Sequence, residues 1–88
     1  MGKYAIQFHP EWDKYFHKLD NAMKQRVMKK ILQLQEDLPA RHLKRGLPIY
    51  VSEIGQYRMA YSIDEAKGIK VLYFVGDHKE YEKWLGLL

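Results

Sequence analysis

Residues 50–84 decide the fold of this chain, and they read YVSEIGQYRMAYSIDEAKGIKVLYFVGDHKEYEKW. Gly55-Gln56 separates two strand-like runs, and glycine at the first central position is typical of a two-residue type II′ turn. Such a turn pairs Glu53 with Arg58, so that a carboxylate and a guanidinium lie side by side. Because side chains alternate along a strand, Arg58 is expected on the face away from an apolar layer. That layer consists of Tyr50, Ile54, Tyr57, Met59, Tyr61 and Ile63.

A second hairpin is predicted directly after the first. Residues 64–68 form a turn-rich break, so residues 69–75 should return antiparallel to residues 57–63. The start of one strand then neighbours the end of the other. Arg58 is therefore expected near residues 74–76.

The last helix is expected to begin where this hairpin ends. Asp77 and Glu80 suit the N-cap and N3 positions of a helix, a variant of the capping box. His78 then lies in the first turn, and Tyr81 follows three residues later on the same side. The two hairpins and this helix predict one catalytic site, which consists of Glu53, Arg58, His78 and Tyr81.

The rest of the chain predicts a strand and a helical hairpin. Residues 4–8 alternate as a strand, and a short helix is expected to open at His9 or Pro10. Its buried stripe is Trp12, Tyr15, Phe16 and Leu19. Asp20-Asn21 caps a second helix that runs to about Asp37. The inner face of this second helix is Met23, Val27, Ile31, Leu34 and Leu38.

These elements predict a single α+β domain over residues 1–88. The order is β-α-α-β-β-β-α, with a mostly antiparallel four-stranded sheet, a helical hairpin packed on it and a short C-terminal helix. There is no cysteine, which argues against a disulfide framework and fits a cytoplasmic protein. No apolar run reaches the roughly 20 residues of a membrane span, and no signal-peptide pattern opens the chain.

Several classes of chemistry lack their sequence signatures. No phosphate loop, dinucleotide fingerprint or nucleophile elbow is present. His9, His17 and His42 have no companions at ligand spacing, so neither a metal site nor another cofactor is expected.

The formal net charge is +4, and most of the cations lie in the helical half. This indicates either a surface for a polyanion or an acidic protein, or a solvated helix face. A basic loop leads from there into the first hairpin, and its cations are expected to bind substrate phosphates. With Lys79, the residues expected to bind substrate phosphates are Arg41, Lys44, Arg45 and Lys79.

Each residue of the predicted site also has a structural explanation. Arg58 suits a guanidinium that holds a phosphate during phosphoryl transfer, or half of an ordinary ion pair with Glu53. His78 suits an acid–base group or a solvated capping residue. Tyr81 suits stacking on an exposed base or a place in the core, and Glu53 suits a base or a partner for Arg58.

Two segments, 54–61 (IGQYRMAY) and 75–81 (VGDHKEY), resemble the RelE/ParE superfamily of toxins from toxin–antitoxin systems. The resemblance implies metal-independent cleavage of mRNA on the ribosome, in which the 2′-OH attacks the adjacent phosphate and leaves a cyclic phosphate. It matches Arg58 to the arginine that stabilises the transition state and His78 to the acid–base position. Tyr81 approximates the terminal tyrosine of the family.

The chain departs from the RelE pattern on the second strand, where Val51 and Glu53 replace basic residues. A glutamate here is similar to the YoeB branch, in which a Glu and a His share the acid–base work. The ParE branch keeps the fold, lacks the nuclease residues and inhibits DNA gyrase. Glu53, Arg58 and His78 together favour the nuclease.

Two other functions stay open: a ParE-like or degenerate homologue that only binds a partner, and a plain nucleic-acid-binding module. The partners that the resemblance implies are an acidic antitoxin, the ribosome and mRNA. Both a homodimer and a heterotetramer with the antitoxin are compatible with the sequence.

Overall fold

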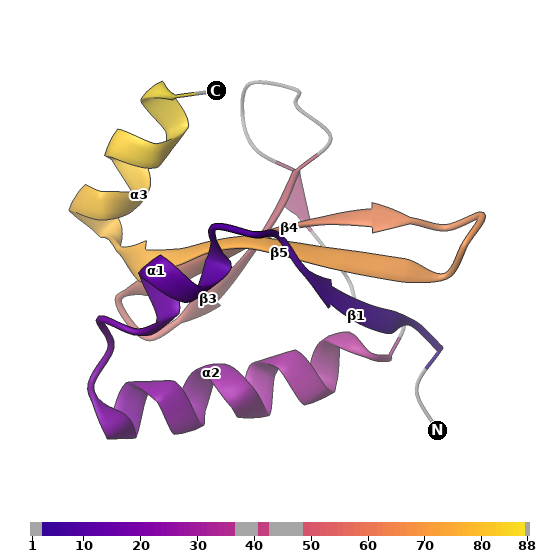
Figure 1. Ribbon diagram of the computed structural model, residues 1–88, viewed down its shortest axis with the longest axis horizontal. Helices are drawn as coiled ribbons and strands as arrows, with labels where there is room; N and C mark the ends of the chain where they lie inside the picture. The colour runs from indigo at the N-terminus through magenta and orange to yellow at the C-terminus, as the bar shows by residue number, and fades with distance from the viewer. Residues whose placement is uncertain (1–2, 37–40, 43–48, 88) are drawn as a thin grey trace.

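The computed structural model describes residues 3–36 and 49–87 and the backbone of residues 41 and 42 (Figure 1). Its strands are β1 (Ala5–Phe8), β2 (Arg41–His42), β3 (Tyr50–Ile54), β4 (Tyr57–Asp64) and β5 (Ile69–Asp77). Its helices are α1 (Trp12–Phe16), α2 (Asn21–Leu34) and α3 (His78–Gly86). No helix in this part of the chain is long and apolar enough to cross a membrane.

The strands form one sheet in the order β1-β5-β4-β3-β2. β1 is parallel to β5, and every other pair is antiparallel. The predicted α+β fold is therefore confirmed, with its four main strands and its helices in the expected order. The fifth strand, β2, is not predicted, because Arg41 and His42 fall in the basic loop expected before the first hairpin. A strand of two residues has no alternation that a sequence pattern can reveal.

Both predicted hairpins have the expected register. Glu53 pairs with Arg58, and Ile54 pairs with Tyr57. Arg58 in turn pairs with Gly76 of β5. The irregularity between Ala60 and Tyr61 lies further along β4 and leaves these pairs intact.

The helical hairpin is shorter than predicted. α1 ends at Phe16, so Leu19 is buried in the connection rather than in the helix. α2 begins at its Asp20 cap as predicted, where the carboxylate accepts a hydrogen bond from the N–H of Met23. It ends at Leu34 instead of Asp37, because backbone groups beyond it bond to other elements: the N–H of Tyr4 donates to the carbonyl of Gln35.

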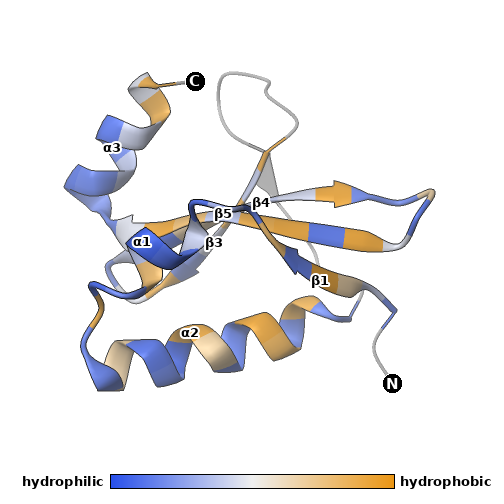
Figure 2. Cartoon of the chain, in the orientation of Figure 1, coloured by the Kyte–Doolittle hydropathy of each residue, from blue (hydrophilic) through white to orange (hydrophobic). Residues whose placement is uncertain are grey.

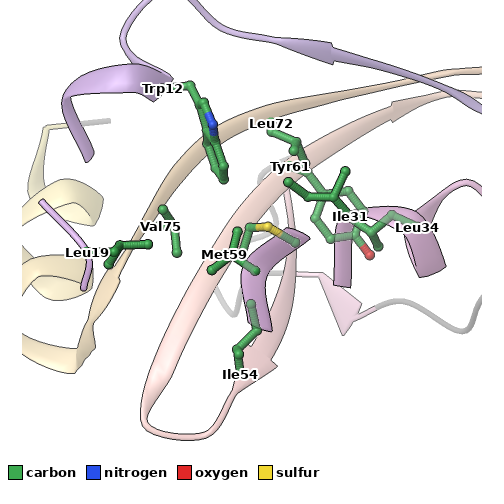
Figure 3. Packing of buried hydrophobic residues seen from close by; sticks show 10 residues of the cluster. Trp12, Leu19, Ile31, Leu34, Ile54, Met59, Tyr61, Leu72 and Val75 are labelled. Atoms are coloured by element: carbon green, nitrogen blue, oxygen red, sulfur yellow. The ribbon is translucent and has the colours of Figure 1, made fainter. Parts of the chain in front are cut away.

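The sheet is covered on both faces. The face toward α2 carries the predicted apolar layer. Its buried members Ile54, Met59 and Tyr61 form one cluster with Ile31 and Leu34 of α2 (Figure 3). Figure 2 shows hydrophobic and hydrophilic positions interspersed along α2, whereas β5 is mostly hydrophobic. Leu38, the last residue predicted on this helix face, lies outside the described residues.

The opposite face has a core of its own, which the sequence did not predict. Ala60 and Phe74 of the sheet pack there with Tyr81 and Trp84 of α3. Tyr15 of α1 lies edge-on against Phe74, with the ring centroids 4.8 Å apart. Arg58, on the same face, is consequently half-buried rather than solvent-exposed.

Lys70 of β5 is only 1% exposed, and the sequence did not predict this burial. Its ammonium donates a hydrogen bond to the carbonyl of Glu36 and lies 4.4 Å from the centroid of the Tyr4 ring. A buried ammonium needs such partners, because desolvation is expensive for a charged group. Lys70 thus ties the end of α2 to the sheet.

Candidate functional site

An open cleft of about 690 Å³ lies where the first hairpin meets the start of α3. Its lining residues come from the β3–β4 turn, the first residues of β4 and the β5–α3 junction. They are Glu53, Gly55, Gln56, Tyr57, Arg58, Asp77, His78 and Lys79.

The turn positions one wall of the cleft. Gly55 has a φ of 61°, whereas Gln56 keeps a negative φ, and this is the combination that a type II′ turn requires. The predicted turn is confirmed. Because it joins directly paired strands, it fixes Glu53 and Arg58 as neighbours across the hairpin.

The first turn of α3 forms the other wall. The Asp77 carboxylate accepts a hydrogen bond of 2.9 Å from the N–H of Glu80, and the Glu80 carboxylate accepts one of 3.3 Å from the N–H of Asp77. The predicted capping box is therefore confirmed. It holds the helix start in place and thereby orients His78 and Lys79, which lie between its two members.

Gly76 allows α3 to begin so close to the sheet. A Cβ at this position would lie 2.7 Å from Cζ of Phe74 and 3.1 Å from Cβ of Glu80. Real side chains do not approach so closely, so only glycine fits without a rearrangement. The sequence motif Gly76-Asp77 thus encodes both the close approach and the cap.

Arg58 points away from α2 and lies over the ring of Tyr81, with its guanidinium carbon 5.0 Å from the ring centroid. Tyr81 is 4% exposed, and its ring stacks with that of Trp84. A cation over a tyrosine face is attracted by the negative charge of the π system. Tyr81 therefore lies beneath Arg58. Its ring belongs to the core and is not exposed.

His78 lies at the rim, where it is well exposed. Its Nε2 is 3.5 Å from a carboxylate oxygen of Glu82, one helical turn on, and this contact is an ion pair when the imidazole is protonated. Such a side chain can exchange protons with solvent and with a ligand in the cleft.

The structure thus gathers four of the predicted site residues at the cleft: Glu53, Arg58, His78 and Lys79. Tyr81 lies below it. Lys44 and Arg45 fall outside the described residues, and Arg41 is described by its backbone in β2 alone. The predicted site does not include two other lining residues, Asp77, which directly precedes His78, and Gln56, which lies two residues before Arg58.

Tyr57 has two environments. It was predicted to face the core, and its ring does pack against the α2-side cluster. It also lines the cleft, because it follows the turn directly and is only half-buried. Within the described residues, no group of three or more His, Cys, Asp or Glu side chains is arranged to hold a metal ion.

No protein-family model and no curated protein matches the sequence. Solved structures do match the fold. The toxin–antitoxin complex RelBE2 of Mycobacterium tuberculosis matches with a TM-score of 0.77 at 22% identity, over 89% of this chain and 94% of that chain. The isolated RelE toxin of Escherichia coli matches with a TM-score of 0.71 at 19% identity, over 97% and 99% of the two chains.

A structure from an archaeon extends the comparison. The RelE–RelB complex of Pyrococcus horikoshii matches with a TM-score of 0.70 at 17% identity, over 85% of this chain and 94% of that chain. Backbone agreement over nearly whole chains at such low identity reflects a shared architecture. The chain therefore has the fold of the RelE toxins.

Proposed function

We propose that this chain is the toxin of a toxin–antitoxin pair and that it cleaves ribosome-bound mRNA without the help of a metal ion. The observation that carries the proposal is the cleft, which combines a fixed guanidinium with two proton-transferring groups. Arg58 lies over the ring of Tyr81, while Glu53 and His78 lie on the two walls of the cleft. The RelE fold supports the same conclusion.

In the proposed reaction, the ribose 2′-OH attacks the adjacent phosphorus, and the bond to the 5′ oxygen breaks. Arg58 binds the phosphate and stabilises the charge that develops on its oxygens. Glu53 and His78 share the proton transfers: one accepts the 2′ proton, and the other protonates the leaving 5′ oxygen. The products are a 2′,3′-cyclic phosphate and a 5′-OH end.

Single-turnover cleavage of mRNA on intact ribosomes tests this proposal. The ribosomes are assembled with magnesium, and the protein is then added with enough EDTA to remove loosely bound metal but not to dissociate the subunits. We expect cleavage to continue and to leave cyclic phosphate ends. Cleavage that stops under these conditions, with the ribosomes still intact, would contradict the metal-independent mechanism.

We further propose an acidic, partly disordered antitoxin that folds on binding. The positive charge of the helical half supports such a partner, as does the presence of RelB in the complexes with the same fold. Co-expression with the adjacent reading frame should give a complex whose association rate falls as salt rises. If no partner co-purifies and the chain alone is harmless to cells, the toxin proposal loses its basis.

A non-enzymatic, ParE-like function is the second candidate. The absence of basic side chains at Val51 and Glu53 of β3 favours it, because a polyanion would find less positive charge on that strand. Under this alternative the chain would bind the acidic partner and inhibit growth, yet the ribosomal assay would yield no cleaved mRNA.

A further inference from the structure

Arg26 of α2 lies against the turn that forms the tip of the first hairpin. A Cβ built on Gly55 would lie 3.0 Å and 3.3 Å from the two terminal nitrogens of the Arg26 guanidinium. Gly55 itself lines the cleft. The guanidinium of Arg26, which is distant in sequence from this hairpin, therefore lies next to the cleft, with Gly55 between them.

Arg26 and Arg58 lie on opposite sides of this hairpin tip. Arg58 lies on the face of the sheet that α3 covers, over Tyr81. Arg26 approaches from α2, which packs against the other face through Val27. A chain that crosses the turn would meet one guanidinium on each side.

The positive charge continues along α2 from Arg26. Lys29 and Lys30 follow at spacings of three and four residues, which bring side chains of adjacent helical turns close together. Residues 21–34 contain no Asp or Glu to neutralise them. Between described residues, no ion pair includes a side chain of α2.

We propose that Arg26, together with Lys29 and Lys30, binds the backbone of the RNA strand where it leaves the cleft over the Gly55-Gln56 turn. This inference rests on the proposed function, since it assumes that RNA occupies the cleft. A planar guanidinium with five donors suits a phosphate better than an ammonium does. Arg26 borders the cleft at Gly55, so a strand bound in the cleft can continue past Arg26. This continuity favours RNA over an acidic protein as the ligand of the three cations.

The test compares two variants of α2 that lose the same charge. R26Q removes the proposed contact. K24Q is the matched control, because Lys24 lies on the other flank of the helix, 5.8 Å from the centroid of the Phe16 ring. The measurements are anisotropy of a labelled single-stranded RNA at several salt concentrations and steady-state cleavage of mRNA on ribosomes.

We expect R26Q to weaken RNA binding by roughly three- to tenfold and to lower the salt slope by about 0.7, the value for one contact to a single strand. In the cleavage assay, KM should rise by a similar factor while kcat stays unchanged, because Arg26 binds the strand outside the reacting bond. K24Q should match the parent protein in both binding and cleavage. R26Q should unfold at the same denaturant midpoint as the parent, since Arg26 is exposed, and K24Q slightly below it, since the half-buried Lys24 loses its contact with the Phe16 ring.

Three results would overturn the inference. The first is an R26Q variant that behaves as K24Q while the parent binds and cleaves RNA, which leaves the proposed function intact. The second is an R26Q variant that binds RNA normally but loses an acidic co-expressed protein, which would assign this flank of α2 to that partner. The third is a parent that neither binds nor cleaves RNA, which would overturn the proposed function as well.

Discussion

The guanidinium carbon of Arg58 lies 5.0 Å from the centroid of the buried Tyr81 ring. Arg58 comes from the first hairpin and Tyr81 from the last helix, so this contact joins the two walls of the cleft. It also restricts a long side chain that would otherwise sample many rotamers. Tyr81 therefore serves the proposed reaction as a residue that positions Arg58.

Two substitutions of Tyr81 should distinguish the contribution of its aromatic ring from that of its hydroxyl. Tyr81→Phe keeps the aromatic face, and we expect single-turnover cleavage within about threefold of the parent rate. Tyr81→Leu removes the face, and the loss of a contact of roughly 1 kcal/mol or more should slow cleavage by about tenfold. If Tyr81→Phe is as slow as Tyr81→Leu, the hydroxyl takes part in the reaction and the positioning role is wrong.

Arg58→Ala should affect activity far more than folding. The variant loses a half-buried cation–π contact, so the free energy of unfolding should fall by only about 1 kcal/mol. Cleavage should fall by about 100-fold or more, because the charge on the transition state loses its stabilising group. Lys67→Ala, in the exposed β4–β5 turn, is the matched control for the loss of one positive charge. Equal toxicity of the Arg58 variant and this control would remove Arg58 from the mechanism.

Patterns of residues that are close in sequence were sufficient to predict the two walls of the cleft. Gly55-Gln56 fixed the turn type, and Asp77 with Glu80 fixed the helix start, because both signals depend on residues that are close in sequence. The contact between Arg26 and Gly55 joins α2 to a later hairpin, and no local pattern encodes it. The second core around Phe74 was missed for a similar reason. Small and polar residues between its members concealed a face that becomes apolar only when α1 and α3 pack on it.

Gly76 should be intolerant of even one methyl group. Gly76→Ala places its Cβ 2.7 Å from Cζ of Phe74, so the free energy of unfolding should fall by about 1–3 kcal/mol. Gly86→Ala is the matched control, because nothing lies within 4 Å of its added Cβ. Since alanine favours helix, this control should be neutral or slightly stabilising. Urea unfolding measures both variants, and equal midpoints would show that α3 shifts freely from the strand end.

Stability should fall at alkaline pH through Tyr61. Burial raises the pKa of its phenol above the ordinary value of 10.0, and the nearby Tyr50 adds to the rise. As the pH rises above about 10, the unfolded chain releases this proton while the folded chain keeps it, so the free energy of unfolding decreases. Tyr61→Phe has no proton to lose, and its unfolding should depend less on pH between 9 and 11 (a range of roughly one unit on each side of the unfolded value). An identical pH dependence in both proteins would contradict this assignment.

The two residues proposed to transfer protons should be separable by their pH profiles. Metal-independent attack by a 2′-OH needs one group to accept its proton and another to protonate the leaving 5′ oxygen. Glu53, on β3 opposite Arg58, is suited to act as the base, and the exposed His78 is suited to act as the acid. Glu53→Gln should then flatten the acidic limb of the single-turnover profile, and His78→Gln should flatten the basic limb. Both residues are exposed, so neither change should alter the free energy of unfolding by more than a few tenths of a kcal/mol. If both variants keep the parent profile, the proton transfers belong to other groups of the cleft, among which Lys79 is the next to substitute.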